Sequence, residues 1–383
     1  MRHISILVTC IFFLNYSFAQ QTCNDETIMN TKGSWKKNSD ANPFPDESFP
    51  KNQFAQANDR IDKMQKLLQA AYPDLKGIQA EWYRSISGDA LMKGGPVPYE
   101  LDALFLAYYC NTYENKIEPG GETGTWFYVW ANQLNWFAKY INIYTIHKLP
   151  VYLLNKKIGA LNGYPLYEGI NNGTSNTGTV YSRAVMITRP GQSPYLPVTK
   201  KQFLKAFVNY HEKRNPKFIA DLEKNTTVLT DEEEEAYKEK QLAKIEQVTP
   251  ADKLSRAKDN FLRNYVTSRQ RKEASIAQSK KFYEEELKPA RTLLADSLNT
   301  DLEQPAILDY NNLLEYKEFT TEKEGGQQLV RLNPDYFNMT LQKYVPQLLI
   351  VYWSWDKGKP QENFKKQIEA NFNFNALKEM IDK

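Results

Sequence analysis

The chain has 383 residues, of which 41% are hydrophobic and 25% are charged, and this balance excludes an intrinsically disordered chain. Its 49 Lys and Arg residues and 46 Asp and Glu residues give a formal net charge of +3. A charge so close to balance excludes a protein that coats nucleic acid, and we expect no nucleic-acid partner.

Residues 1–19 have the pattern of a secretory signal peptide. Arg2 and His3 precede a mostly apolar run over 4–14, and Ser17-Phe18-Ala19 offers small residues at the −3 and −1 positions of a cleavage site. The run is shorter than the ~20 residues that a membrane-spanning helix needs. The sequence therefore predicts cleavage after Ala19, a secreted or periplasmic location, and a mature chain that is not transmembrane.

Cysteine usage agrees with export. Cleavage would remove Cys10 and leave Cys23 and Cys110. Two cysteines in an oxidising compartment predict one disulfide bond between them. The alternative is a pair of separate buried thiols, because free cysteine often packs as a small apolar residue.

Apolar spacing predicts mixed secondary structure in residues 20–198, the N-terminal part of the body. After an irregular lead-in, residues 58–72 have the spacing of an amphipathic helix, whereas residues 101–109 fit a helix or a buried strand. Asn- and Gly-rich turns, including Asn162-Gly163, separate the strand candidates that follow. These candidate strands of an antiparallel sheet are 125–131, 151–154, 158–167 and 180–188.

Residues 199–304 are predicted to form a long helical insertion. Thr199, Thr230 and Thr249 each precede a helical pattern, and Asn215-Pro216 could break the first helix. The third helix is expected to continue to about Leu287, with a solvated middle because 267–275 contains no large apolar residue. Two long antiparallel helices that project from the body would explain this pattern.

Residues 305–383 return to the composition of the first part of the body. We expect strands at 328–332 and 347–353 and a closing helix at 364–381. If the late strands add to the earlier sheet, the helices are an insertion into one body. The predicted fold class is α+β: an antiparallel sheet with flanking helices and a long helical insertion.

The familiar catalytic and cofactor motifs are missing from the sequence. The mature chain contains only His147 and His211, which we interpret as structural, His211 on the surface or half-buried. There is no Gly-x-Ser-x-Gly, Ser-x-x-Lys, HExxH, phosphate-binding loop or dinucleotide fingerprint. We therefore expect no catalytic residues, no metal and no cofactor.

Aromatic residues are the one feature that suggests a binding site. Trp126, Tyr128 and Trp130 alternate, so on a strand they share one face, and Trp353 and Trp355 repeat the spacing on a later strand. Such rows suit stacking against a sugar ring or a peptide, and they equally suit core packing under helices.

Three stretches carry a resemblance to a known group of proteins. They are Pro-Tyr-Leu-Pro-Val-Thr-Lys-Lys-Gln-Phe-Leu at 194–204, Arg-Leu-Asn-Pro-Asp-Tyr-Phe-Asn at 331–338 and Tyr-Val-Pro-Gln-Leu-Leu-Ile-Val-Tyr-Trp at 344–353. With the Lys-, Asn- and Tyr-rich composition, the mature chain resembles uncharacterised secreted proteins of Bacteroidota-type bacteria. The resemblance implies an exported bacterial protein and transfers no activity or site residue.

Two functions remain open from the sequence. The first is a non-catalytic binding or interaction protein of the cell envelope, whose partner is an envelope protein or a glycan ligand. The second is a carboxylate-dependent hydrolase of an envelope or dietary polymer, for which Glu122, Glu168 and Asp335 are candidate acids at strand or turn edges near aromatic residues. A hydrolase should show two carboxyl groups ~5–10 Å apart, whereas a binding protein should show exposed aromatic rings without that pair.

Overall fold

The computed structural model describes residues 23–40, 51–86, 90–111, 113–114, 116–121, 123–134, 137–169, 173–175, 178–296 and 298–383. The expected signal peptide, with Cys10 and the cleavage site after Ala19, lies outside these residues. The fold is α+β, as predicted. The chain forms two units: described residues up to Lys139, Tyr152–Leu196 and Leu332–Lys383 belong to the first, and Tyr140–Val151 and Pro197–Arg331 belong to the second.

The first unit is built on a large sheet with the strand order β1-β2-β3-β5-β15-β11-β9-β8, in which β4 pairs with β3 and β10 pairs with β11. Its strands are β1 (Trp35–Lys37), β2 (Ile78–Ile86), β3 (Tyr99–Asn111), β4 (Lys116–Pro119), β5 (Trp126–Ala131), β8 (Lys157–Leu161), β9 (Tyr164–Glu168), β10 (Gly173–Ser175), β11 (Gly178–Ile187) and β15 (Leu349–Asp356). Residues 101–109 are therefore a strand. Strand β15 lies between β5 and β11, so the second of the two late strands joins the earlier sheet. The first, β14 (Gln327–Leu332), lies in the smaller sheet instead, which corrects the expectation for that strand.

The sheet is mixed, whereas the sequence predicted an antiparallel one. Strand β1 runs parallel to β2, and the other described pairs of this sheet are antiparallel. The chain passes from β1 to β2 through helix α3 (Phe54–Ala71). A parallel pair requires such a crossover, and the irregular composition of the lead-in gave no sign of β1.

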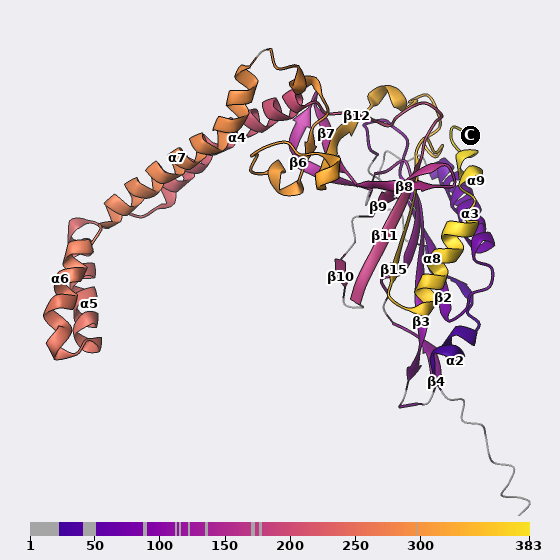
Figure 1. Cartoon of the computed structure of the whole chain (residues 1–383), viewed down its shortest axis with the longest axis horizontal. Helices are drawn as coiled ribbons and strands as arrows, with labels where there is room; N and C mark the ends of the chain where they lie inside the picture. The colour runs from indigo at the N-terminus through magenta and orange to yellow at the C-terminus, as the bar shows by residue number, and fades with distance from the viewer. Residues whose placement is uncertain are drawn as a thin grey trace, which may run out of the picture. The chain divides into compact units, whose positions relative to one another are not determined.

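Helices cover one face of this sheet. Figure 1 shows α3 and α8 (Lys359–Asn371) side by side along the strands. Alternate strand residues such as Phe105, Phe127 and Trp353 form one apolar core with Ile61 of α3 and Phe364 of α8. Two short helices complete the unit, α2 (Asp25–Asn30) and α9 (Phe374–Lys378). The predicted closing helix 364–381 is thus two helices, α8 and α9.

A tight turn divides the predicted strand 158–167 into the hairpin of β8 and β9. Asn162 and Gly163, which the sequence identified as a turn, have φ angles of 51° and 84°. Two consecutive positive φ angles are typical of the two-residue hairpin turn whose twist matches that of the flanking strands.

The chain also forms a smaller sheet with the order β12-β14-β7-β6, in which β13 pairs with β14. Its strands are β6 (Ala138–Ile146), β7 (Leu149–Leu154), β12 (Tyr195–Pro197), β13 (Ile307–Leu308) and β14 (Gln327–Leu332). Aromatic rings attach the base of helix α4 (Lys200–Asn225): the Phe203 ring centroid lies 5.7 Å from that of Tyr144 and 5.8 Å from that of Tyr316. Short 3-10 helices in the chain are η1 (Lys51–Gln53), η2 (Thr300–Glu303), η3 (Tyr310–Leu313), η4 (Glu322–Glu324) and η5 (Pro334–Tyr336).

The predicted helical insertion, residues 199–304, contains α4, α5 (Asp231–Val248), α6 (Ala251–Asn264) and α7 (Ser268–Ala295). Helix α4 continues through Pro216, so the expected break there is wrong. The predicted single helix after Thr249 is also wrong, because a capping box of Thr267 and Gln270 begins α7 as a separate helix. In Figure 1, α4 lies beside α7, and α5 lies beside α6.

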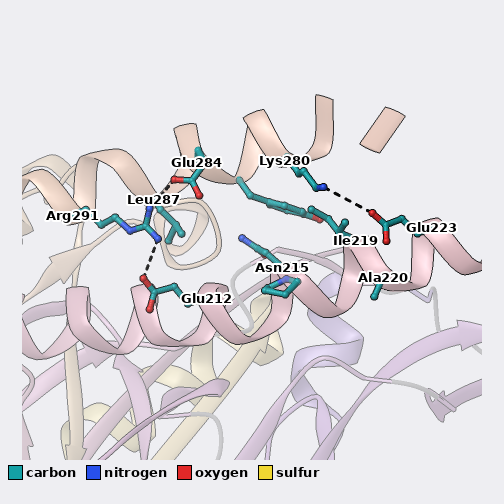
Figure 2. A pocket seen from close by; sticks show the side chains of 11 residues that line it. Glu212, Asn215, Ile219, Ala220, Glu223, Lys280, Glu284, Leu287 and Arg291 are labelled. Carbon is teal, nitrogen blue, oxygen red and sulfur yellow. Dashed lines mark hydrogen bonds and ion pairs between the residues drawn. The ribbon is translucent and has the colours of Figure 1, made fainter. Parts of the chain in front are cut away.

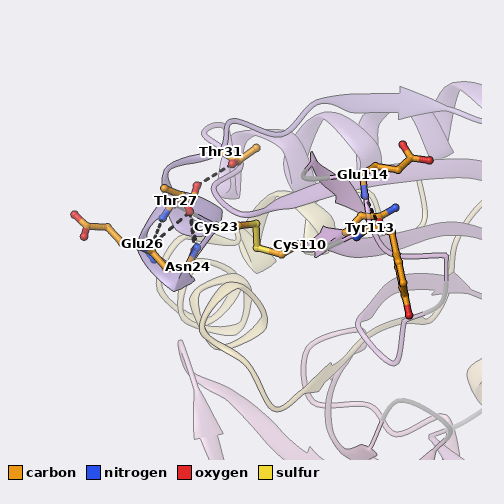
Figure 3. The surroundings of a disulfide bond; sticks show 9 residues. Cys23, Asn24, Glu26, Thr27, Thr31, Cys110, Tyr113 and Glu114 are labelled. Carbon is orange, nitrogen blue, oxygen red and sulfur yellow. Dashed lines mark hydrogen bonds between the residues drawn. A yellow bond between two sulfur atoms is a disulfide. The ribbon is translucent and has the colours of Figure 1, made fainter. Parts of the chain in front are cut away.

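The predicted disulfide bond is present between Cys23 and Cys110 (Figure 3), with the two Cα atoms 5.9 Å apart. It links the start of α2 to β3. The adjacent Asn24 caps α2, because its side-chain oxygen accepts hydrogen bonds from the backbone N–H groups of Glu26 and Thr27 at 3.0 and 2.9 Å. The bond therefore anchors a helix that has no buried residue of its own.

Candidate ligand-binding site

The two predicted aromatic rows lie on opposite faces of the large sheet. In the register of β5 and β15, Tyr128 lies opposite Tyr352, whereas Trp353 lies opposite Phe127. Trp353 and Trp355 are buried in the core that α3 and α8 cover. The structure therefore separates these two residues from the row on β5, which occupies the other face.

On that other face, the rings of β5 form a continuous stack. The Tyr128 ring centroid lies 5.7 Å from that of Trp126, with an interplanar angle of 10°, and 5.1 Å from that of Trp130. Tyr352 of β15 extends the row, 5.2 Å from Trp130. Trp130 and Tyr352 are buried, but Trp126 and Tyr128 are only half-buried, so part of the stack remains open to a ligand.

Two carboxyl groups lie beside this stack. In the pairing of β3 with β5, Glu100 is opposite Trp130 and Asp102 is opposite Tyr128. Because they are two residues apart on one strand, both side chains point to the same face, with Cα atoms roughly 7 Å apart. Tyr83 lies opposite Asp102 on β2. We use the name aromatic-acidic face for the set Tyr83, Glu100, Asp102, Trp126, Tyr128, Trp130 and Tyr352.

Asp102 is only 4% exposed. Its carboxyl group accepts a hydrogen bond from the Tyr83 hydroxyl. Its Oδ1 atom has no hydrogen-bond partner among the described residues. Burial, together with the negative charge of Glu100, raises the pKa of Asp102 to about 8. Asp102 therefore keeps its proton at neutral pH and can donate a hydrogen bond.

Glu100 has a different environment. Burial raises the pKa of its carboxyl group, whereas hydrogen bonds from Gln133, Ser85 and Trp130 act in the opposite direction because they stabilise the charged form. The Gln133 amide nitrogen donates to Glu100 Oε2 at 2.8 Å. Of the two groups, Glu100 is therefore the one that first loses its proton.

Of the acids that the sequence suggested, neither Glu168 nor Asp335 belongs to this face. Glu122 is outside the described residues, Glu168 lies on β9 opposite Arg183, and Asp335 lies in η5. Sequence reasoning missed Glu100 and Asp102. The sequence did contain a signal for them, namely two acids at alternate positions in the otherwise apolar segment 99–109. That signal points to a site only when the segment is a strand paired with β5.

The two histidines do not contribute to this face. His147 is exposed in the turn between β6 and β7, where its φ angle is 53°. His211 is fully buried on α4, which corrects the expectation of a surface or half-buried position. Its ring faces α7, with Nδ1 3.2 Å from Glu286 Oε2, because α4 and α7 pack along their length.

The described part of the chain holds no group of three or more His, Cys, Asp or Glu residues that could bind a metal ion. None of its helices combines the length and the apolar character needed to cross a membrane. Comparisons of the chain with protein-family models, with curated proteins and with solved structures found no match.

Proposed function

We propose that the protein is an exported, non-catalytic binding protein of the cell envelope, and that its aromatic-acidic face binds a glycan. The observation that carries this proposal is the half-open stack of Trp126 and Tyr128 beside the buried carboxyl group of Asp102. The apolar faces of sugar rings stack on aromatic rings, and their hydroxyl groups pair with side chains that donate or accept hydrogen bonds.

Export is part of this proposal. It is supported by the signal-like pattern of residues 1–19 and by the disulfide bond, since such bonds persist mainly in oxidising compartments. The intact mass of the protein recovered from its host tests this part, and the expected chain begins at Gln20 or within a residue or two of it.

Glycan binding can be measured by tryptophan fluorescence during titration with soluble chitin and β-glucan oligosaccharides. We expect Trp126→Ala and Tyr128→Ala each to weaken binding at least about tenfold, because each removes a stacking surface. Tyr113→Ala is the matched control, since Tyr113 is fully exposed in a turn away from β5. The proposal fails if neither oligosaccharide binds, or if all three variants bind as the wild type does.

The pair of Glu100 and Asp102 favours a second candidate, a carboxylate-dependent hydrolase. One carboxyl that keeps its proton beside one that loses it is the arrangement of a general acid and its partner carboxylate. In that case the wild type should release reducing ends from a bound oligosaccharide, while Asp102→Asn and Glu100→Gln should bind without release. Binding without release by the wild type would exclude this candidate.

A further inference from the structure

A cleft of about 480 Å³ lies between α4 and α7 in the second unit (Figure 2). Its apolar surface comes from Pro216, Ile219 and Ala220 of α4 and from Tyr283 and Leu287 of α7. Small-molecule sites in proteins are commonly ~300–1,000 Å³ and mostly apolar. The cleft therefore has the size and the surface of a site for a small ligand.

The charged side chains that line the cleft are already paired. Arg291 bridges Glu212 and Glu284 at 3.0 and 2.8 Å, and Lys280 lies 3.9 Å from Glu223. Figure 2 shows these pairs between the two helices, on either side of Asn215. Arg291 serves two glutamates, so the five lining charges sum to −1, which disfavours an anionic ligand. Each of the three glutamates already has a basic partner, so we expect the ligand to be uncharged.

Asn215 is a buried polar residue in the lining of the cleft. It is 6% exposed, and neither its amide nitrogen nor its amide oxygen has a hydrogen-bond partner among the described residues. Buried amide groups are nearly always hydrogen-bonded, and an unpaired one destabilises the fold. A ligand that offers both an acceptor and a donor would satisfy the two atoms together.

We propose that this cleft binds a small uncharged molecule with an apolar body and a carboxamide-type group that pairs with Asn215. The apolar body lies against Ile219, Tyr283 and Leu287, and the carboxamide meets Asn215 in the lining of the cleft. This site is separate from the aromatic-acidic face, which belongs to the other unit, so either proposal can fail without the other.

The test is a ligand-observed NMR titration of the full chain with benzamide, and with toluene as the probe that lacks the amide. We expect the wild type to bind benzamide at least about tenfold more tightly than toluene. Asn215→Leu should abolish this preference and raise the thermal unfolding midpoint, because it removes an unpaired buried amide. Asn209→Leu, at an exposed position of the same helix, is the matched control and should preserve the preference.

A second variant tests the position of the ligand. Ile219→Trp fills the cleft and should weaken both probes at least about tenfold. Equal binding of benzamide and toluene by the wild type overturns the proposal. A preference that survives in Asn215→Leu also overturns it, as does unchanged binding by Ile219→Trp.

Discussion

Asp102 shows how one buried acid changes the balance between the folded and unfolded chain. Its carboxyl group is held among Tyr83, Tyr128 and Glu100, where burial raises its pKa to about 8. In the unfolded chain the same group has its ordinary pKa near 3.8. Between these two values the folded state keeps a proton that the unfolded state has released, so the contribution of Asp102 to stability falls as the pH rises.

The replacement Asp102→Asn should therefore stabilise the protein most at high pH. Near pH 4 the folded group is protonated and the unfolded group is only partly ionised, so the variant should differ little from the wild type. At pH 9 it should be more stable by at least about 2 kcal/mol, since each unit of pKa shift corresponds to about 1.4 kcal/mol. Urea unfolding at both pH values measures the difference.

Asp335→Asn is the control for this measurement, because that side chain is exposed and should give no gain that grows with pH. A stability gain for Asp102→Asn that is the same at pH 4 and pH 9 would contradict the raised pKa.

At the scale of elements, α2 depends on covalent attachment. None of its six residues is buried. Apart from the disulfide bond, its links include an ion pair between Lys359 and Asp25 at 2.9 Å and the hydrogen bond from the Gly77 N–H to the Thr31 carbonyl at 2.8 Å. Short helices without a buried face are unstable in water, so the bond between Cys23 and Cys110 should decide whether α2 stays folded.

Removal of this bond should affect α2 before the sheet. In the variant with both cysteines replaced by alanine, we expect faster amide hydrogen exchange over Asp25–Asn30 and continued protection of β3. The global stability loss should be up to about 4 kcal/mol for a loop of 87 residues.

Thiol titration of the unfolded, unreduced wild-type protein should find no free thiol. Two free thiols, or an α2 that exchanges no faster in the variant, would contradict this role.

Elements with local signals could be predicted from the sequence. Thr199 and Thr230 do cap α4 and α5, and β5 and β11 follow the expected β-branched and aromatic runs. Two features of the helices could not be predicted: α4 continues through Pro216, and a separate helix begins after Thr267. Pro216 removes one backbone donor, but α4 continues because packing along α7 outweighs that loss, and the Thr267 cap lies in a stretch without Gly or Pro.

The candidate site required tertiary information. The spacing of Trp126, Tyr128 and Trp130 correctly placed them on one face of a strand, but the same rule gave no relation between β5 and β15. The register of those strands puts Trp353 and Trp355 on the opposite face. The position of Glu100 and Asp102 beside the aromatic row likewise follows only from the pairing of β3 with β5.

At the scale of the whole molecule, the position of β15 explains how distant parts of the chain are held together. This strand comes from the last part of the sequence and pairs with β5 on one side and β11 on the other. Segments before and after the helical residues 200–295 therefore share one sheet and one core. The helices α5 and α6 contribute nothing to that core, since Glu234 is their only buried residue.

Limited proteolysis should reveal this division. Trypsin is expected to cut first between Lys224 and Lys280, because helices with so little buried surface open locally at low free-energy cost. The lysines of α3 and α8 are the internal control: Lys63 and Lys365 lie on helices that bury apolar residues in the core, and cleavage there should be slow. Mass spectrometry of early digests identifies the order of cuts.

The nicked protein should then remain a single particle in size-exclusion chromatography under non-denaturing conditions, because β15 holds the C-terminal fragment between β5 and β11. Its tryptophan emission should stay close to that of the intact chain, since Trp130 and Trp353 keep their buried environment. If residues 20–198 and 305–383 instead separate as two stable fragments, the two parts do not form one body. The predicted insertion would then have to be replaced by three independent domains.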